Sequence, residues 1–153
     1  MKPKNLVLRN RKHLAHGNYV RKASPDTDYW FGIDESQIKK LIAKHGTHFF
    51  LVIAGAKDDA TDFFIIPYIQ VKPLLTRQIA TISHDGRRRW YAKVRHGQLI
   101  VNNQTKRKLD VVCGNVTALV TAMLSLDKCR TMIATMVASP PIGLFEGAEL
   151  DFG

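Results

Sequence analysis

Residues 87–95 read RRRWYAKVR, and the alternation of their side chains predicts a β-strand. One face of this strand would carry four cations and one aromatic ring: Arg87, Arg89, Tyr91, Lys93 and Arg95. The other face would carry Arg88, Trp90, Ala92 and Val94, of which the last three suit a core. The basic face is suited to lie against a phosphate backbone, with the tyrosine free to stack or to hydrogen-bond. The alternative is a solvated edge strand on which positive charge discourages aggregation.

The flanking segments indicate that this strand belongs to a hairpin. Upstream, His84-Asp85-Gly86 has the composition of a tight turn. Downstream, His96-Gly97 leads into residues 98–104, QLIVNNQ, which we expect to pair with residues 87–95. Residues 105–110, TKRKLD, are then expected to form a basic loop.

Two strands are predicted before the hairpin. Residues 47–55, THFFLVIAG, form a nearly continuous apolar run, which is typical of a buried strand. Residues 62–67, DFFIIP, predict a second strand that ends at Pro67, because proline cannot donate to a ladder. A short helical turn through residues 68–75 is expected to follow it.

Apolar residues at helical spacing predict two helices. Asp34 or Ser36 would cap the first, which runs to about His45 and stops at Gly46. Its buried stripe would contain Ile38, Leu41 and Ile42. Asn115 would cap the second, which runs to about Asp127. One face of that helix would hold Val116, Leu119, Val120, Met123 and Leu124.

The two ends of the chain are less regular. Residues 1–25 mix basic and short apolar pieces, and predict either a strand near residues 6–8 or a basic arm that orders on binding. We expect one DNA-binding domain over residues 1–130, with residues 131–153 as an apolar and then acidic C-terminal tail or linker. The element order predicts an α+β fold, with a mostly antiparallel β pseudobarrel flanked by two or three helices.

The charge of the chain is large and unevenly placed. The formal net charge is +10, and residues 87–108 hold eight Lys and Arg residues and no acidic residue. Residues 1–48 hold ten Lys and Arg residues against four acidic ones, so two basic blocks supply the whole excess. An excess of this size indicates a polyanionic partner, nucleic acid first and an acidic membrane surface second. Segregation into blocks favours a binding surface over general solubility.

Cysteine content and hydropathy indicate a compartment. Cys113 and Cys129 form no CxxC motif and are read as buried thiols of a reducing cytosol. The N-terminus lacks the apolar core of a signal peptide, and no apolar run approaches the roughly 18 residues of a membrane span. A soluble, cytoplasmic protein is therefore expected.

The residues predicted to bind DNA form three groups. The first is the basic face of residues 87–95 described above. The second joins amides that suit adenine edges to a basic run: Asn102, Asn103, Gln104, Lys106, Arg107 and Lys108. The third would grip the other side of the duplex or an adjacent groove: Arg9, Arg11, Lys12, Arg21 and Lys22. For each residue taken singly, surface solubility is the competing interpretation.

The sequence contains few of the motifs that are typical of enzymes. The phosphate-binding glycine loops, the metalloprotease motif and the serine-hydrolase motif do not occur. The pairs His13/His16 and His45/His48 lack further zinc ligands in register, and Cys113 with His96 lacks an orienting group. Asp62 and Lys72 resemble part of a PD-(D/E)xK nuclease, which would need Mg²⁺, but Gln70 stands where the second carboxylate belongs.

The segments FFLVIAG, DFFIIP, FIIPYIQVKPLL and RRRWYAKV together resemble a DNA-binding pseudobarrel. This is the fold shared by plant B-three transcription-factor domains and the effector domains of EcoRII-type restriction endonucleases. The resemblance covers residues 47–101, a little over a third of the chain. It implies a sequence-specific reader of duplex DNA that grips the major groove with two arms.

The sequence thus predicts specific recognition of double-stranded DNA by a non-catalytic chain that needs no cofactor. The chain would be a freestanding reader or the target-recognition module of a restriction or defence system, with a nuclease domain or subunit as partner. The alternatives are a Mg²⁺-dependent nuclease built on Asp62 and Lys72, and a protein-interaction subunit that docks through residues 131–153. RNA is less favoured because the basic row holds one aromatic residue, whereas stacking platforms usually hold two or three.

Overall fold

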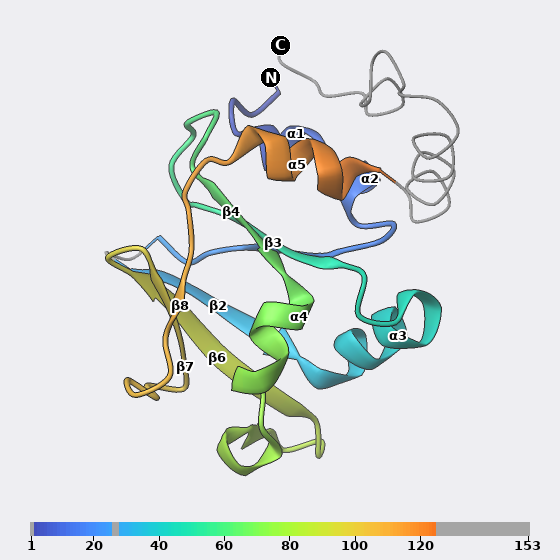
Figure 1. Ribbon diagram of the computed structural model, residues 1–153, viewed down its shortest axis with the longest axis vertical. Coiled ribbons are helices and arrows are strands. Elements are labelled where there is room, and N and C mark those ends of the chain that lie inside the picture. Colours follow the sequence, from blue (N-terminus) through green and yellow to red (C-terminus); the bar gives the residue numbers. More distant parts are fainter. Residues whose placement is uncertain (1, 26–27, 125–153) are drawn as a thin grey trace, which may run out of the picture.

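The computed structural model describes residues 2–25 and 28–124 of the 153-residue chain. Its helices are α1 (Leu6–Arg9), α2 (Arg11–Leu14), α3 (Glu35–His45), α4 (Tyr68–Val71) and α5 (Val116–Met123), with the short 3-10 segments η1 (Lys72–Leu74) and η2 (Arg77–Ile79). Its strands are β1 (Tyr19–Lys22), β2 (Tyr29–Asp34), β3 (Phe50–Ala54), β4 (Phe63–Pro67), β5 (Thr81–Ile82), β6 (Arg88–Arg95), β7 (Gln98–Val101) and β8 (Leu109–Asp110). The fold is α+β, as predicted. Figure 1 shows α1, α2 and α5 gathered at one end of the molecule.

The strands form two sheets. The three-stranded sheet has the order β1-β3-β4, in which β1 is parallel to β3 and β4 is antiparallel to it. The five-stranded sheet has the order β2-β6-β7-β8 and is antiparallel throughout, with β5 pairing to the first residues of β6. The predicted hairpin is confirmed, because Arg95 pairs with Gln98 across the turn formed by His96 and Gly97. Both turn residues have positive φ, which suits a tight hairpin turn.

Two contacts bring the sheets toward an open barrel. Beyond β8, Cys113 makes an isolated antiparallel bridge to Phe64 of β4. Beyond β1, the Ser24 N–H donates to the Trp30 carbonyl of β2 at 2.8 Å. The strands thus follow one another around the core as β1, β3, β4, β8, β7, β6 and β2. Within the described residues the two ladders are not joined into one continuous sheet.

The three-stranded sheet lies between two cores. On one side it packs against the five-stranded sheet through residues such as Leu51, Ile66 and Trp90. On the other side, the helices α1, α2 and α5 cover it and contribute Val7, Leu14 and Leu119. Both faces of β3 are therefore apolar, which accounts for the unbroken apolar run in the sequence.

The first 25 residues differ from the prediction. Residues 6–8 form helix α1 in place of a strand, and the Asn5 side chain caps it by accepting from the N–H groups of Val7 and Leu8. Leu6, Val7 and Leu14 are buried, so α1 and α2 belong to the fold and are not a free arm. Four-residue helices have little stability of their own, and it is this packing that holds them.

The predicted helices are confirmed, with one error in their buried faces. Asp34 caps α3, and Gly46 ends it with a φ of 61°. Ile38 is buried and Leu41 packs on the core, but Ile42 is 38% exposed. Asn115 caps α5, whose buried residues include Leu119 and Met123; the expected extension to Asp127 and the tail 131–153 lie outside the described residues. Over residues 2–25 and 28–124, no helix has the length and apolar character that crossing a bilayer requires.

Candidate nucleic-acid interface

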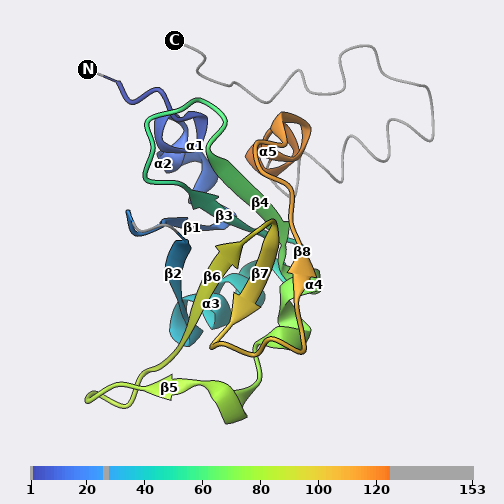
Figure 2. The same ribbon diagram turned by 90° about the vertical axis from the view of Figure 1, so that its left-hand side faces the viewer.

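The face of the five-stranded sheet that points away from the core carries the basic row predicted from the sequence. Trp90, Ala92 and Val94 are buried, whereas the residues between them face outward. Tyr91 is 44% exposed. Figure 2 looks onto this sheet, with α3 behind β6. We call this surface the outer face; along β6 and the residue before it, it consists of Arg87, Arg89, Tyr91, Lys93 and Arg95.

Carboxylates partly neutralise the outer face, which the sequence did not predict. Arg95 contacts Asp28 at 2.7 Å, and Arg87 contacts Asp85 at 3.1 Å. Arg89 lies 3.8 Å from Asp34. These ion pairs make the row less positive than its sequence indicates, and they give three of its four cations a structural role as well.

Asp34 and Arg89 connect α3 to the outer face. The Asp34 carboxylate accepts from the Ser36 hydroxyl at 2.6 Å and from the first N–H groups of α3. The Ser36 hydrogen bond is the largest reason that the pKa of Asp34 lies below its usual value, against the opposing effect of burial. The Arg89 stem crosses β2 at Gly32, where a side-chain Cβ would meet it at 3.3 Å. A larger residue at position 32 would contact this stem tightly, so the glycine leaves room for Arg89 beside Asp34.

Arg95 and Asp28 form the tightest ion pair on this face. Nε and a terminal nitrogen of the guanidinium both donate to the carboxylate, at 3.1 Å and 2.7 Å, in the two-pronged geometry that favours arginine over lysine. This bonding lowers the pKa of Asp28 and raises that of Arg95. The pair joins the start of β2 to the end of β6.

Lys93 is the cation of the row that has no carboxylate partner within the described residues. Its ammonium lies 4.9 Å from the centre of the Trp30 ring, a cation–π contact. Trp30 pairs with Lys93 across β2 and β6 and is half-buried. Trp30 was not among the predicted residues, because the sequence of β2 did not indicate a strand. The outer face thus has two aromatic residues, Trp30 and Tyr91, on neighbouring strands.

The predicted base-reading amides have different environments. The Asn102 oxygen accepts from the Tyr91 N–H at 2.7 Å, and its nitrogen donates to the Ile79 carbonyl. Both ends of this amide are bonded to backbone, so Asn102 holds the end of β7 in place. Asn103 and Gln104 are exposed, and Asn103 has a φ of 59° in the turn that follows β7.

The loop between β7 and β8 carries the second basic group. Lys106, Arg107 and Lys108 are all exposed. None of the three has a carboxylate partner in the part of the chain that the structure describes. Arg107 and Gln104 line a hollow of about 270 Å³ together with Gln78 and Thr76, where the loop meets η2. This loop therefore presents its charge to solvent.

The third predicted group is divided among several elements. Arg9 lies on α1 and donates from Nε to the Pro3 carbonyl, and Lys12 on α2 and Lys22 on β1 are exposed. Arg11 and Arg21 meet at one cleft, where Lys40 of α3 joins them. Lys40 was not among the predicted residues, because nothing in the linear order indicated that α3 and α2 line one cleft.

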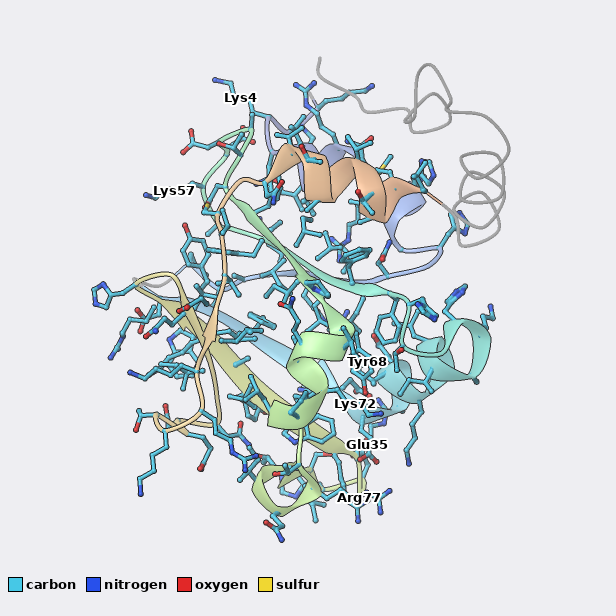
Figure 3. The ribbon with its side chains drawn as sticks, in the orientation of Figure 1. Lys4, Glu35, Lys57, Tyr68, Lys72 and Arg77 are labelled. Atoms are coloured by element: carbon cyan, nitrogen blue, oxygen red, sulfur yellow. The ribbon has the colours of Figure 1, made fainter. Side chains whose placement is uncertain are left out.

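A further cluster surrounds Glu35 at the start of α3. Its carboxylate lies within 3.3–3.8 Å of Lys39, Arg77 and Arg88. Figure 3 shows Glu35 and Arg77 close together, below Tyr68 and Lys72. One acidic group thus faces three cations, and the local charge remains positive.

The structure does not bring the two predicted nuclease residues together. Asp62 lies just before β4, whereas Lys72 begins η1, after β4 and α4. The two residues therefore lie at opposite ends of β4, which is about 15 Å long. Lys57, whose N–H donates to Asp62, lies far from Lys72 in Figure 3. The Asp62 carboxylate is buried and accepts from the Tyr29 hydroxyl at 2.6 Å, which raises the pKa of Tyr29. Asp62 therefore joins the two sheets.

The other reactive side chains considered from the sequence are a cysteine pair and several histidines. Cys113 is exposed at the edge of β4, contrary to the expectation of a buried thiol, although local burial raises its pKa; Cys129 lies outside the described residues. Among residues 2–25 and 28–124, no three His, Cys, Asp or Glu side chains are grouped to hold a metal ion. His13, His16 and His45 instead line a hollow of about 240 Å³ beside Met123.

No family model, curated protein or solved structure matches this chain.

Proposed function

We propose that this chain binds nucleic acid, with double-stranded DNA as its target, through the outer face and the loop between β7 and β8. The observation that carries the proposal is the set of loop cations Lys106, Arg107 and Lys108, which are exposed beside the outer face and have no carboxylate partner in the described chain. A clustered basic surface of this kind is the electrostatic footprint of nucleic-acid binding, in which Lys and Arg neutralise phosphates.

The balance of charge over the described residues supports a polyanionic partner. These residues include 21 Lys and Arg residues and eight Asp and Glu residues, a formal net charge of +13. Even if every acidic side chain neutralised one cation, 13 cations would remain. Ion pairing within the protein therefore accounts for only part of the basic content.

Different side chains would take different roles in this complex. The loop cations and Lys93 would contact phosphates and so position the duplex. Asn103 and Gln104 would read base edges, since amide pairs match the donor and acceptor pattern of adenine. Asn102 is left out of this set because its amide is bonded to backbone at both ends.

No cofactor is required for this binding. A restriction or defence system in the cytoplasm, with a separate nuclease subunit, remains the context we propose.

Single-stranded nucleic acid is a second candidate, favoured by Trp30. Aromatic rings on a basic sheet face stack with unpaired bases, at about 1–3 kcal/mol per base. Trp30 and Tyr91 lie on adjacent strands of the outer face, with Lys93 over the indole ring. A bound base would replace Lys93 on Trp30, and the displaced ammonium would be free for a phosphate.

Fluorescence anisotropy across a salt series tests both candidates. The probes are a random-sequence duplex and a matched single strand, in DNA and in RNA. The loop variant combines Lys106→Gln, Arg107→Gln and Lys108→Gln. The control combines Lys44→Gln, Lys57→Gln and Lys72→Gln, which removes the same charge from exposed lysines elsewhere.

We expect the wild-type chain to bind the duplex with a steep salt dependence. The loop variant should lose about 2.7 units of the slope of log K against log salt, since each lost phosphate contact removes about 0.9. The control should change the slope by less than one unit. Preference for the single strand, with affinity lost on Tyr91→Ala, would select the second candidate. No binding of any probe at low salt would refute both.

A further inference from the structure

A cleft between α2, β1 and α3 is lined by cations from all three elements. Arg11 comes from α2, Arg21 from β1 and Lys40 from α3. The cleft has a volume of about 320 Å³, and none of the residues that line it is acidic. Cations up to 29 positions apart in sequence thus line one cleft, and no carboxylate among the described residues lines it with them.

Arg21 is held in place by contacts that involve no carboxylate among the described residues. One terminal nitrogen of its guanidinium donates to Gln37 at 2.8 Å, and the other donates to the Val20 carbonyl at 3.3 Å. Its central carbon lies 4.5 Å from the centre of the Tyr19 ring. These contacts orient the guanidinium and leave several of its five N–H groups available. A binding group that is already oriented loses little entropy when a ligand arrives.

The rest of the lining leaves the positive charge in place. Burial raises the pKa of Tyr19, so its hydroxyl stays neutral; this hydroxyl donates to the Gly32 carbonyl and accepts from the Asp34 N–H. The Gln37 oxygen accepts from Arg21, and its NH₂ group has no partner among the described residues. The cleft therefore offers donors and positive charge.

We propose that this cleft is a binding site for a phosphoryl group. Arginine presents a planar fork that matches phosphate oxygens, and lysine adds a point charge. The volume lies at the lower end of the roughly 300–1,000 Å³ typical of small-ligand sites, which suits a phosphate with part of an attached sugar. The phosphoryl group would belong to a free phosphate, a nucleotide or a nucleic-acid backbone. The site does not depend on the function proposed above, although it would give a nucleic acid a second point of attachment.

Isothermal titration calorimetry of the full chain tests the proposal with five probes. They are inorganic phosphate, adenosine monophosphate, adenosine as the uncharged control, and a dinucleotide with and without a 5′-phosphate. The cleft variant is Arg11→Gln with Lys40→Gln, two exposed residues whose loss should not disturb folding. The matched control is Lys12→Gln with Lys44→Gln, which removes the same charge from the same two helices outside the cleft.

We expect phosphate and the nucleotide to bind and adenosine not to bind. The cleft variant should weaken binding at least tenfold, and the control should change it less than twofold. Equal binding of the dinucleotide with and without its 5′-phosphate would identify a backbone diester, and preference for the phosphorylated form would identify a terminal phosphate. Equal losses in both variants, or no phosphate binding by wild type, would overturn the proposal.

The same two variants separate this site from the function proposed above. If the wild-type chain binds the duplex but neither phosphate nor the mononucleotide, the phosphoryl site in the cleft is refuted. The proposed nucleic-acid binding would then still be supported. Phosphate binding that depends on Arg11 and Lys40, in a chain without affinity for any polynucleotide, would support the cleft and refute the function.

Discussion

The two sheets of this protein use similar strand pairing for different purposes. In β3 of the three-stranded sheet, four consecutive residues from Leu51 to Ala54 are fully buried. In β6 of the five-stranded sheet, burial alternates, and the residues that face outward are polar or aromatic. Successive side chains point to opposite faces of a strand, so the first sheet is covered on both faces and the second on one. The difference teaches that stability is concentrated in one sheet, while the other leaves a face free for a partner.

The largest expected effect is on the doubly covered sheet. Leu51→Ala should lower the free energy of unfolding by about 2–5 kcal/mol, because a cavity would form where no solvent can enter. Tyr91→Ala on the outer face is the matched comparison and should cost less than about 1 kcal/mol. Urea denaturation measures both values. Similar costs for the two variants would break the distinction between the sheets.

A second test concerns the contact that joins the sheets. A Cβ at Gly55 would lie 2.0 Å from the Asp62 carboxylate, which accepts from Tyr29 of the other sheet. Gly55→Ala should therefore cost about 1–3 kcal/mol through overpacking. In an Asp62→Ala background, the same change should cost clearly less, because the clash is gone. If Gly55→Ala lowers the free energy of unfolding equally in the two backgrounds, Asp62 is not the group that a side chain at position 55 would contact.

The smallest effect is expected where α3 meets the outer face. Asp34→Ala removes a helix cap and the partner of Arg89, at a cost of about 1–2 kcal/mol near neutral pH. The folded-state pKa of Asp34 is below the unfolded value of about 3.9, so its stabilisation is present above pH 4 and disappears as the pH falls through the folded pKa. The difference in the free energy of unfolding between wild type and Asp34→Ala, measured by urea denaturation, should therefore be smaller at pH 2. A constant difference from pH 6 to pH 2 would contradict this role of Asp34.

The strands with a clear pattern could be predicted from sequence, and the others could not. Residues 47–55, 62–67 and 87–95 have apolar runs or strict alternation, and each contains a strand. β1 and β2 were missed, since YVRK is short and half polar and YWFGID contains a glycine. The glycine is Gly32, beside which the Arg89 stem crosses the strand. Tertiary packing, not local preference, decides these segments.

In the candidate site too, features that depend on a local pattern could be predicted from sequence, and features that depend on tertiary contacts could not. The outward row of β6 depends on alternation within one strand, so the sequence predicted its members. Its neutralisation depends on pairs such as Arg95 with Asp28, which are 67 residues apart. The cleft depends on Lys40 lining the same space as Arg11, which no local pattern indicates. Composition predicted how much charge the chain has, but only the topology decides which charges meet.

The two indoles of the chain have separate environments, and this gives the protein an optical reporter of its own. Trp90 is buried, and its Nε1 donates to the Thr76 carbonyl at 2.8 Å. Trp30 lies half-buried on the outer face under the Lys93 ammonium. Light emitted by Trp90 should therefore follow unfolding, while emission from Trp30 should follow events at the outer face without any attached dye. One fluorescence spectrum would therefore report both ligand binding at the outer face and unfolding of the protein.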